Sequence, residues 1–349
     1  MNSIKYMAIA LLFFTSCKKE ENKPSVAENY TNGILVLNEG LFQHNNSSLS
    51  WLDLSTNEVT TDLFLSINNR PIGDTGNDML LYGSKLYIAV TGSSTIEVLD
   101  RNSLKSIKQI PFNYNNQSQE PRKLVVHNGK VFVSSFDGYV TAIDTSSLQI
   151  TKRIKVGRNP EGMCISNNSL YVANSGGLDF GNSDTTVFEI DLSSLNIIDT
   201  FVVGDNPGDM IADDYNNVYL VKRGNNGSNP SELVRINTTN KSVVNLGIPV
   251  TTIAKRGGLL YLSHFNYNTN SSTVSIFDCS SQTLINPNFI SNQDLTTLYG
   301  VIPYKSDQLI CIDAMSFTNS GYLRFFNSSG QLTNSFNVGL NPNSIIHYE

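Results

Sequence analysis

The side chains in this 349-residue sequence that could do chemistry are carboxylates, basic groups and aromatic rings, spread over many short segments. The sequence contains no phosphate-binding glycine loop, no Gly-x-Ser-x-Gly nucleophile elbow and no His-Glu-x-x-His zinc motif. We therefore expect a site that binds without catalysis. The alternative is a hydrolase or lactonase, in which a general acid and base would come from four carboxylates, Glu39, Asp74, Glu161 and Asp209.

One segment is rich in the oxygen ligands that Ca²⁺ prefers, and it holds Asp179, Asn182 and Asp184. The spacing of these residues does not match the twelve-residue calcium loop, and a turn built on Asp and Asn side chains explains the pattern equally well. The segment is therefore a candidate for calcium, with a plain turn as the alternative. No cofactor is expected.

Short apolar runs separate these side chains, and turns of one kind recur between the runs. The turn Gly-x-Asn-Pro occurs at residues 157–160, 204–207 and 339–342. Glycine permits a positive φ, and a residue before proline favours extended backbone, so each copy is expected to separate two strands. A second marker recurs at spacings of 41 to 49 residues, and it is Asp53, Asp100, Asp144, Asp191, Asn237, Asp278 and Asn327.

Seven copies of a unit with four short runs predict an all-β fold, a seven-bladed β-propeller with four antiparallel strands per blade. The first copy lacks the innermost strand, because Gly33 leads directly into the run that is the second strand of every other copy. The last run of the chain, residues 341–348, is such an innermost strand. We predict that this C-terminal strand completes blade 1, which closes the ring and removes a free sheet edge.

The strand order also predicts a difference between the two faces of the ring. In an antiparallel blade, the loop between the second and third strands lies on the same face as the loop to the next blade. Long connections are expected only on this face, which we call the long-loop face, at residues 38–48, 113–120, 174–185, 222–231, 264–272 and 313–320. Long loops on a rigid scaffold commonly carry function, so we expect the ligand there.

The candidate ligand-binding residues are polar or aromatic and are expected on or beside the long-loop face. They are Phe42, His44, Asp74, Arg122, Phe136, Glu161, Phe180, Asp209, Arg223, Phe265, Tyr267, Tyr299 and Phe317.

The N-terminal segment has the pattern of a lipoprotein signal. Residues 1–16 contain Lys5 and a short apolar core followed by small residues, and we expect cleavage before Cys17 and lipidation of that cysteine. Residues 17–32 are polar and predict a flexible tether, which leaves residues 33–349 for the propeller. The expected localisation is the outer membrane, where the protein is lipid-anchored, faces the cell exterior and contacts the membrane only through its lipid.

Composition excludes some partners. The formal net charge is −6, only 15% of the residues are charged, and no basic run occurs, so nucleic acid is not expected as a partner.

Beyond Cys17 the chain has three widely spaced cysteines, Cys164, Cys279 and Cys311. Their odd number and their places in or beside apolar runs predict buried thiols rather than disulfides or a zinc site.

The sequence also resembles a known group of proteins. Tyr171-Val172-Ala173-Asn174 together with the Gly-x-Asn-Pro turn is similar to the YVTN-type propeller repeat. Residues 37–42 and 338–342 resemble surface lipoproteins of Bacteroidota, among them the BtuG-type cobamide-capture proteins. The resemblance implies a monomeric propeller that binds a cobamide such as vitamin B12 and passes it to a TonB-dependent outer-membrane transporter. The alternative is an interaction module that binds a protein or glycan partner.

Overall fold

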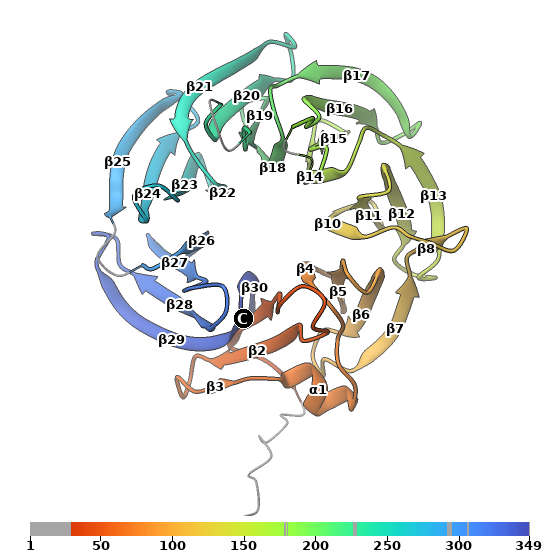
Figure 1. Cartoon of the computed structure of the whole chain (residues 1–349), viewed down its shortest axis with the longest axis vertical. Coiled ribbons are helices and arrows are strands. Elements are labelled where there is room, and N and C mark those ends of the chain that lie inside the picture. Colours follow the sequence, from red (N-terminus) through yellow and green to blue (C-terminus); the bar gives the residue numbers. More distant parts are fainter. Residues whose placement is uncertain are drawn as a thin grey trace, which may run out of the picture.

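In the computed structural model, the chain forms seven four-stranded antiparallel sheets arranged in a ring (Figure 1). The structure describes residues 29–177, 179, 181–225, 229–291, 295–305 and 307–348. Each sheet is one blade, with its first strand nearest the centre of the ring and its last strand on the outer rim (Figure 1). The predicted seven-bladed β-propeller is confirmed.

Blades 1 to 4 have the following strands. Blade 1 contains β30 (Pro342–Tyr348), β1 (Gly33–Asn38), β2 (Ser48–Asp53) and β3 (Val59–Thr60). Blade 2 contains β4 (Gly76–Tyr82), β5 (Lys85–Val90), β6 (Thr95–Asp100) and β7 (Ser106–Pro111). Blade 3 contains β10 (Pro121–His127), β11 (Lys130–Ser135), β12 (Tyr139–Asp144) and β13 (Ile150–Lys155). Blade 4 contains β14 (Pro160–Ser166), β15 (Ser169–Asn174), β16 (Thr186–Asp191) and β17 (Asn196–Val202).

The remaining blades follow the same order. Blade 5 contains β18 (Pro207–Ala212), β19 (Asn217–Lys222), β20 (Glu232–Asn237) and β21 (Val243–Pro249). Blade 6 contains β22 (Thr252–Arg256), β23 (Leu259–Asn266), β24 (Ser271–Asp278) and β25 (Thr283–Ser291). Blade 7 contains β26 (Leu298–Tyr304), β27 (Gln308–Asp313), β28 (Ser320–Phe326) and β29 (Leu332–Leu340). A short hairpin, β8 (Asn113–Tyr114) and β9 (Gln117–Ser118), lies between blades 2 and 3.

The ring is closed by the C-terminal strand, as predicted. Strand β30 pairs antiparallel with β1 from Gly33↔Tyr348 to Asn38↔Pro342. At this seam the Trp51 ring lies edge-on between the rings of Tyr30 and Tyr348, at centroid distances of 5.1 and 5.4 Å. Tyr30 is 3% exposed, so the packed part of the chain begins ahead of Gly33. Residues 1–28, with the expected signal and Cys17, lie outside the described residues.

The recurring Asp or Asn has a direct structural reason in each blade. Its side-chain oxygen accepts hydrogen bonds from backbone N–H groups two to four residues further on, as Asp144 does from Ser146 and Ser147. This arrangement builds the tight turn between the third and fourth strands. The hydrogen bond from the Ser147 N–H lowers the pKa of Asp144, so this carboxylate stays ionised to lower pH.

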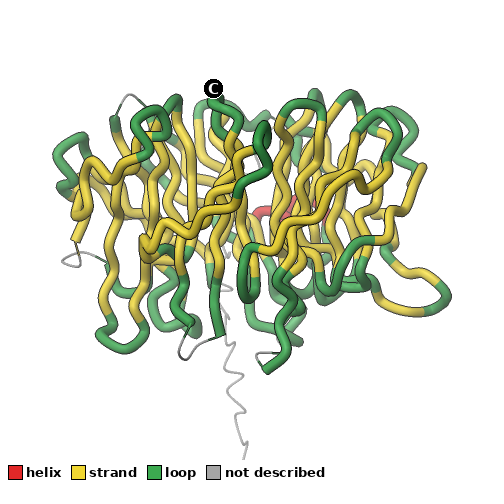
Figure 2. The backbone as a smooth tube through the Cα atoms, turned by 90° about the horizontal axis from the view of Figure 1, so that it is seen from above, coloured by secondary structure: helices red, strands yellow, loops and turns green. Residues whose placement is uncertain are grey.

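The two faces of the ring differ as expected. Connections between first and second strands and between third and fourth strands have two to five residues, and we call this side the short-loop face. The longer connections lie on the other edge of the ring, away from the C-terminus (Figure 2). The expected loop at 264–272 is wrong in extent, because β23 and β24 extend as a hairpin and leave only residues 267–270 between them.

A further long connection on this face was not predicted. Residues 61–75 join blade 1 to blade 2 and contain α1 (Leu63–Asn68), which lies on the outer side beside β2 (Figure 1). Leu63 and Phe64 are buried in the core between blades 1 and 2. The outermost strand of blade 1 has only two residues, so α1 covers an edge that a full strand covers in the other blades.

The backbone at the Asn-Pro turns also differs from the expectation. Asn159, Asn206 and Asn341 were predicted to be extended, but their φ angles are 45°, 56° and 52°. Asparagine tolerates this left-handed region better than most residues. The conformation lets the Asn carbonyl accept a hydrogen bond from the first residue after the second strand of the next blade, for example from Glu39 N to Asn341 O at 2.8 Å.

The interior consists of apolar clusters between neighbouring blades. The thiols of Cys164, Cys279 and Cys311 are buried and free, as predicted. Burial raises the pKa of Cys279 to about 12, so this thiol stays protonated.

In the described part of the chain, no helix has the length and apolar character needed to cross a membrane.

Candidate functional site

The innermost strands carry a repeated irregularity at the end that reaches the long-loop face. In six of them, β4, β10, β14, β18, β26 and β30, one extra residue interrupts the pairing with the adjacent strand near the first positions. A bulge of this kind turns side chains out of the sheet plane. Polar side chains at these positions therefore meet around the mouth of the ring on the long-loop face.

Blades 2 to 5 place a continuous set of charges there, which we call the charged arc. Arg122 binds Glu161 through Nη2–Oε1 at 2.7 Å and Nε–Oε1 at 3.0 Å. On its other side Glu161 faces Arg223, with Nη2–Oε2 at 3.7 Å. Asp209 lies 4.0 Å from Arg223 and 3.9 Å from Lys123. The complete arc is Asp78, Arg122, Lys123, Glu161, Asp209 and Arg223.

Glu161 is the central acid of this arc. Its side chain is only 3% exposed, and among the described residues its buried Oε2 has no donor at hydrogen-bond distance, with Arg223 Nη2 at 3.7 Å. Burial alone would raise the pKa of Glu161, but the charges of Arg122, Arg223 and Lys123 outweigh burial and lower it. A carboxylate held ionised between two guanidinium groups is a weak general base, so the arrangement favours binding over acid–base chemistry.

Two glycines make room for the arc. A Cβ on Gly162 would lie 2.1 Å from the carbonyl oxygen of Gly208, so β14 approaches β18 as closely as only glycine allows. Lys123 of blade 3 reaches across blade 4 to Asp209 of blade 5, with Gly162 of blade 4 beside them. A pocket of about 210 Å³ lies here, lined by Asp78, Lys123, Leu124, Gly162, Met163, Asp209, Met210 and Ile253.

Replacing Gly208 by alanine tests this packing. The new Cβ would lie 2.6 Å from Arg223 Nε, so the guanidinium has to shift from its present place beside Glu161. We expect a loss of about 1–2 kcal/mol in the free energy of unfolding, from strain and a weakened ion pair. Gly181→Ala is the matched control, since its Cβ meets nothing within 4 Å. Urea unfolding of both variants gives the difference, and equal stabilities would contradict the assigned role of Gly208.

Blades 6 and 7 contribute aromatic rings to the same mouth, which we call the aromatic half. Phe265 and Tyr267 pack edge to face with centroids 4.7 Å apart, and Tyr299 and Phe317 do so at 5.6 Å. The Tyr299 hydroxyl donates to Glu39 Oε2 at 3.1 Å, which joins blade 7 to blade 1. Burial raises the pKa of Glu39, and the Tyr299 hydrogen bond offsets part of that rise.

Most of the residues predicted for the site lie at this mouth. Arg122, Glu161, Asp209 and Arg223 belong to the charged arc, and Phe136 lies under the Arg122 guanidinium at 4.5 Å. Phe265 is 6% exposed because it belongs to β23 rather than to a loop, so it supports the exposed Tyr267. The predicted contact residue Phe180 lies outside the described residues.

Three other predicted residues lie in blade 1 or in its connection to blade 2. Phe42 is 69% exposed at the tip of the 39–47 loop, and His44 Nδ1 lies 2.9 Å from the Phe42 carbonyl oxygen. The Asp74 carboxylate accepts from the backbone N–H of Gln43 at 2.9 Å, so it holds this loop against blade 2. Asp74 is therefore occupied with positioning the loop that presents Phe42.

The calcium candidate is organised by protein donors. Asp184 accepts hydrogen bonds from the backbone N–H groups of Arg158, Thr185 and Thr186. Asn182 donates to Asp179 at 3.4 Å, and Asp179 lies 4.0 Å from Arg158. Within the described ranges, no group of three His, Cys, Asp or Glu side chains is placed to hold a metal ion.

Sequence reasoning missed Lys123 and Asp78. Each is the third residue of an innermost strand, after which the apolar part of the strand begins. Asp209 has the same position in β18. A charged residue at the second or third position of an innermost strand, directly ahead of its apolar run, was therefore the signal that could have identified the arc.

Comparison with solved structures supports the fold. A protein from Lactobacillus plantarum has a TM-score of 0.65 at 13% identity, with 92% of this chain and 100% of that chain covered. The computationally designed Ika8 protein gives 0.58 at 10% identity, with 90% of both chains covered. The dihydro-heme d1 dehydrogenase NirN gives 0.58 at 10% identity, covering 93% of this chain and 77% of that chain. These identities show a shared fold alone.

A search of curated proteins finds no match. The family model described as a domain of unknown function, DUF5074, matches residues 32–338, which is nearly the whole propeller. The chain therefore belongs to the DUF5074 family.

Proposed function

We propose that the protein is a non-catalytic capture protein that binds a cobamide such as vitamin B12 on the long-loop face and passes it to a TonB-dependent outer-membrane transporter. The observation that carries the proposal is the division of the mouth into a charged arc and an aromatic half. A corrinoid is a broad ring with an apolar surface and a rim of amides. Aromatic rings suit its surface, while carboxylates and guanidinium groups suit its amides.

The dimensions of the site favour a ligand that lies across the face. The pocket inside the arc has a volume of about 210 Å³, which is too small to enclose a corrinoid. Tyr267 and Phe42 are 72% and 69% exposed and stand on opposite sides of blade 7, so they are available to contact a broad ligand. The same openness would suit a protein or glycan partner, which is the second candidate function.

The place where the chain enters the propeller fits capture at a cell surface. Tyr30 N donates to Asn102 O in a turn of the short-loop face, and β1 starts from that face. The described chain therefore joins the propeller on the face opposite the proposed ligand site. If Cys17 carries a lipid, anchoring through this end leaves the long-loop face available to arriving ligand.

Calorimetry with cyanocobalamin tests the proposal. We expect sub-micromolar binding by the chain from residue 29 onward, and a loss of about tenfold, or 1–2 kcal/mol, in each of Phe42→Ala and Tyr267→Ala. Tyr215→Ala is the matched control, because Tyr215 is 49% exposed but lies in a turn of the short-loop face. The absence of heat with any corrinoid would overturn cobamide capture and leave the protein or glycan partner.

A further inference from the structure

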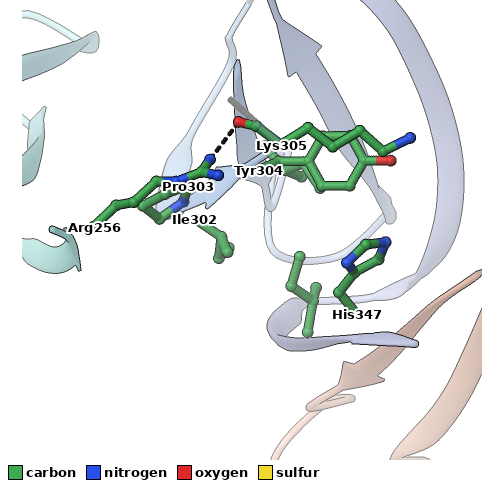
Figure 3. A pocket seen from close by; sticks show the side chains of 8 residues that line it. Arg256, Ile302, Pro303, Tyr304, Lys305 and His347 are labelled. Carbon is green, nitrogen blue, oxygen red and sulfur yellow. Dashed lines mark hydrogen bonds between the residues drawn. The ribbon is translucent and has the colours of Figure 1, made fainter. Parts of the chain in front are cut away.

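A second pocket opens at the opposite mouth of the ring, on the short-loop face. It has a volume of about 220 Å³ and lies where blades 6, 7 and 1 meet. Arg256 and Tyr304 are the last residues of β22 and β26, Lys305 directly follows β26, and His347 belongs to β30 (Figure 3). It shares no lining residue with the pocket inside the charged arc.

The Arg256 guanidinium lines one end of this pocket. It donates to the carbonyl oxygen of Lys305, whose own side chain extends away from Arg256 (Figure 3). The Lys305 ammonium lies 5.1 Å from the centre of the Tyr304 ring, and the His347 ring packs edge-on against Tyr304 at 5.2 Å. Among the described residues, neither Arg256 nor Lys305 has a carboxylate within 4.0 Å, although Asp307 lies in the same turn.

The rest of the lining is apolar. Ile302 and Pro303 come from β26, Ile310 from β27 and Ile345 from β30. The molecule as a whole has a net charge of −6, so a basic group at this mouth is opposite in sign to the overall charge. It attracts anions locally. An apolar wall beside a guanidinium suits a ligand with an anionic group at one end and an apolar body at the other.

We propose that this short-loop pocket binds a small organic carboxylate, with its carboxylate on Arg256 and its apolar body against Ile302, Pro303 and Ile345. The site is independent of the proposed cobamide function, because it lies on the other face and uses other residues. Such a ligand would contact both β26 and β30, and therefore both sides of the seam where the C-terminal strand closes the ring.

Nuclear magnetic resonance with benzoate as the probe tests the site. The four histidines give few imidazole signals, and His347 reports on the short-loop pocket while His44 reports on the long-loop face. We expect benzoate to shift the His347 signal in a saturable way and to leave His44 unchanged. Benzamide, a neutral molecule of the same shape, is expected to bind at least tenfold more weakly.

Variants separate this site from a general effect of charge. Arg256→Gln is expected to weaken benzoate binding at least tenfold, and Lys255→Gln is the matched control because Lys255 pairs with Asp214 outside the pocket. Unchanged binding in Arg256→Gln, or equal affinities for benzoate and benzamide, would overturn the proposal. Equal binding of inorganic phosphate would overturn the assignment of an organic ligand, since phosphate has no apolar body.

Discussion

A chain that ends at Leu340 is expected to lose the cooperative thermal unfolding transition of the complete propeller. The missing β30 pairs with β1 along its whole length and also contacts β4 and β26 of the neighbouring blades. Burial of Tyr348, Ile345 and Ile346 contributes on the order of 5 kcal/mol, and the pairing hydrogen bonds add to it. This sum is comparable with the whole stability of a typical domain, about 5–15 kcal/mol.

Circular dichroism during heating measures this loss. A synthetic peptide of residues 341–349, added to the truncated chain, should restore part of the transition, because β30 joins blade 1 by non-covalent pairing. A peptide of the same composition in scrambled order is the control. If the truncated chain melts like the complete one, closure by β30 does not stabilise the ring.

The closure could be predicted because it depends on counting strands, and the same holds for the blade number. The repeated Asp and Asn residues are local signals: each builds its own turn, so their spacing reports the blades directly. The asymmetry of the loops followed from antiparallel order alone. Helix α1 was missed because it occurs in blade 1 alone, where the outer strand is only two residues long. A repeat pattern predicts the elements that all blades share, and it does not predict an element that one blade has in place of them.

The charged arc could be predicted only in part, because it depends on the bulges of the innermost strands. Arg122 and Glu161 are 39 residues apart in the sequence, and only the ring places them 2.7 Å apart. Lys123 and Asp209 likewise belong to different blades, 3 and 5, and only the ring brings them to 3.9 Å. Long-range geometry of this kind leaves no periodic signal in the sequence.

Glu161→Gln is expected to be the most destabilising single substitution in the charged arc. It removes the negative charge between Arg122 and Arg223 and leaves two guanidinium groups facing each other across a neutral amide. Breaking a buried ion pair costs about 3–5 kcal/mol, but Arg223 is 36% exposed, so solvent screening reduces the expected cost to about 2–3 kcal/mol. Asp179→Asn is the matched control, since its contact with Arg158 is exposed on both sides and should contribute under about 1 kcal/mol.

The effect of Glu161→Gln should depend on pH in a defined direction. The folded protein holds the pKa of Glu161 below its ordinary value of 4.5, because the arginine charges outweigh the effect of burial. The ionised carboxylate therefore stabilises the fold fully above pH 4.5, and this contribution is lost as the pH falls through the lower folded pKa. Urea unfolding of both proteins from pH 7 downward should show the difference in unfolding free energy shrinking only below pH 4.5. A difference that stays constant to pH 3 would mean that the Glu161 charge does not stabilise the arc, and that the substitution acts through packing.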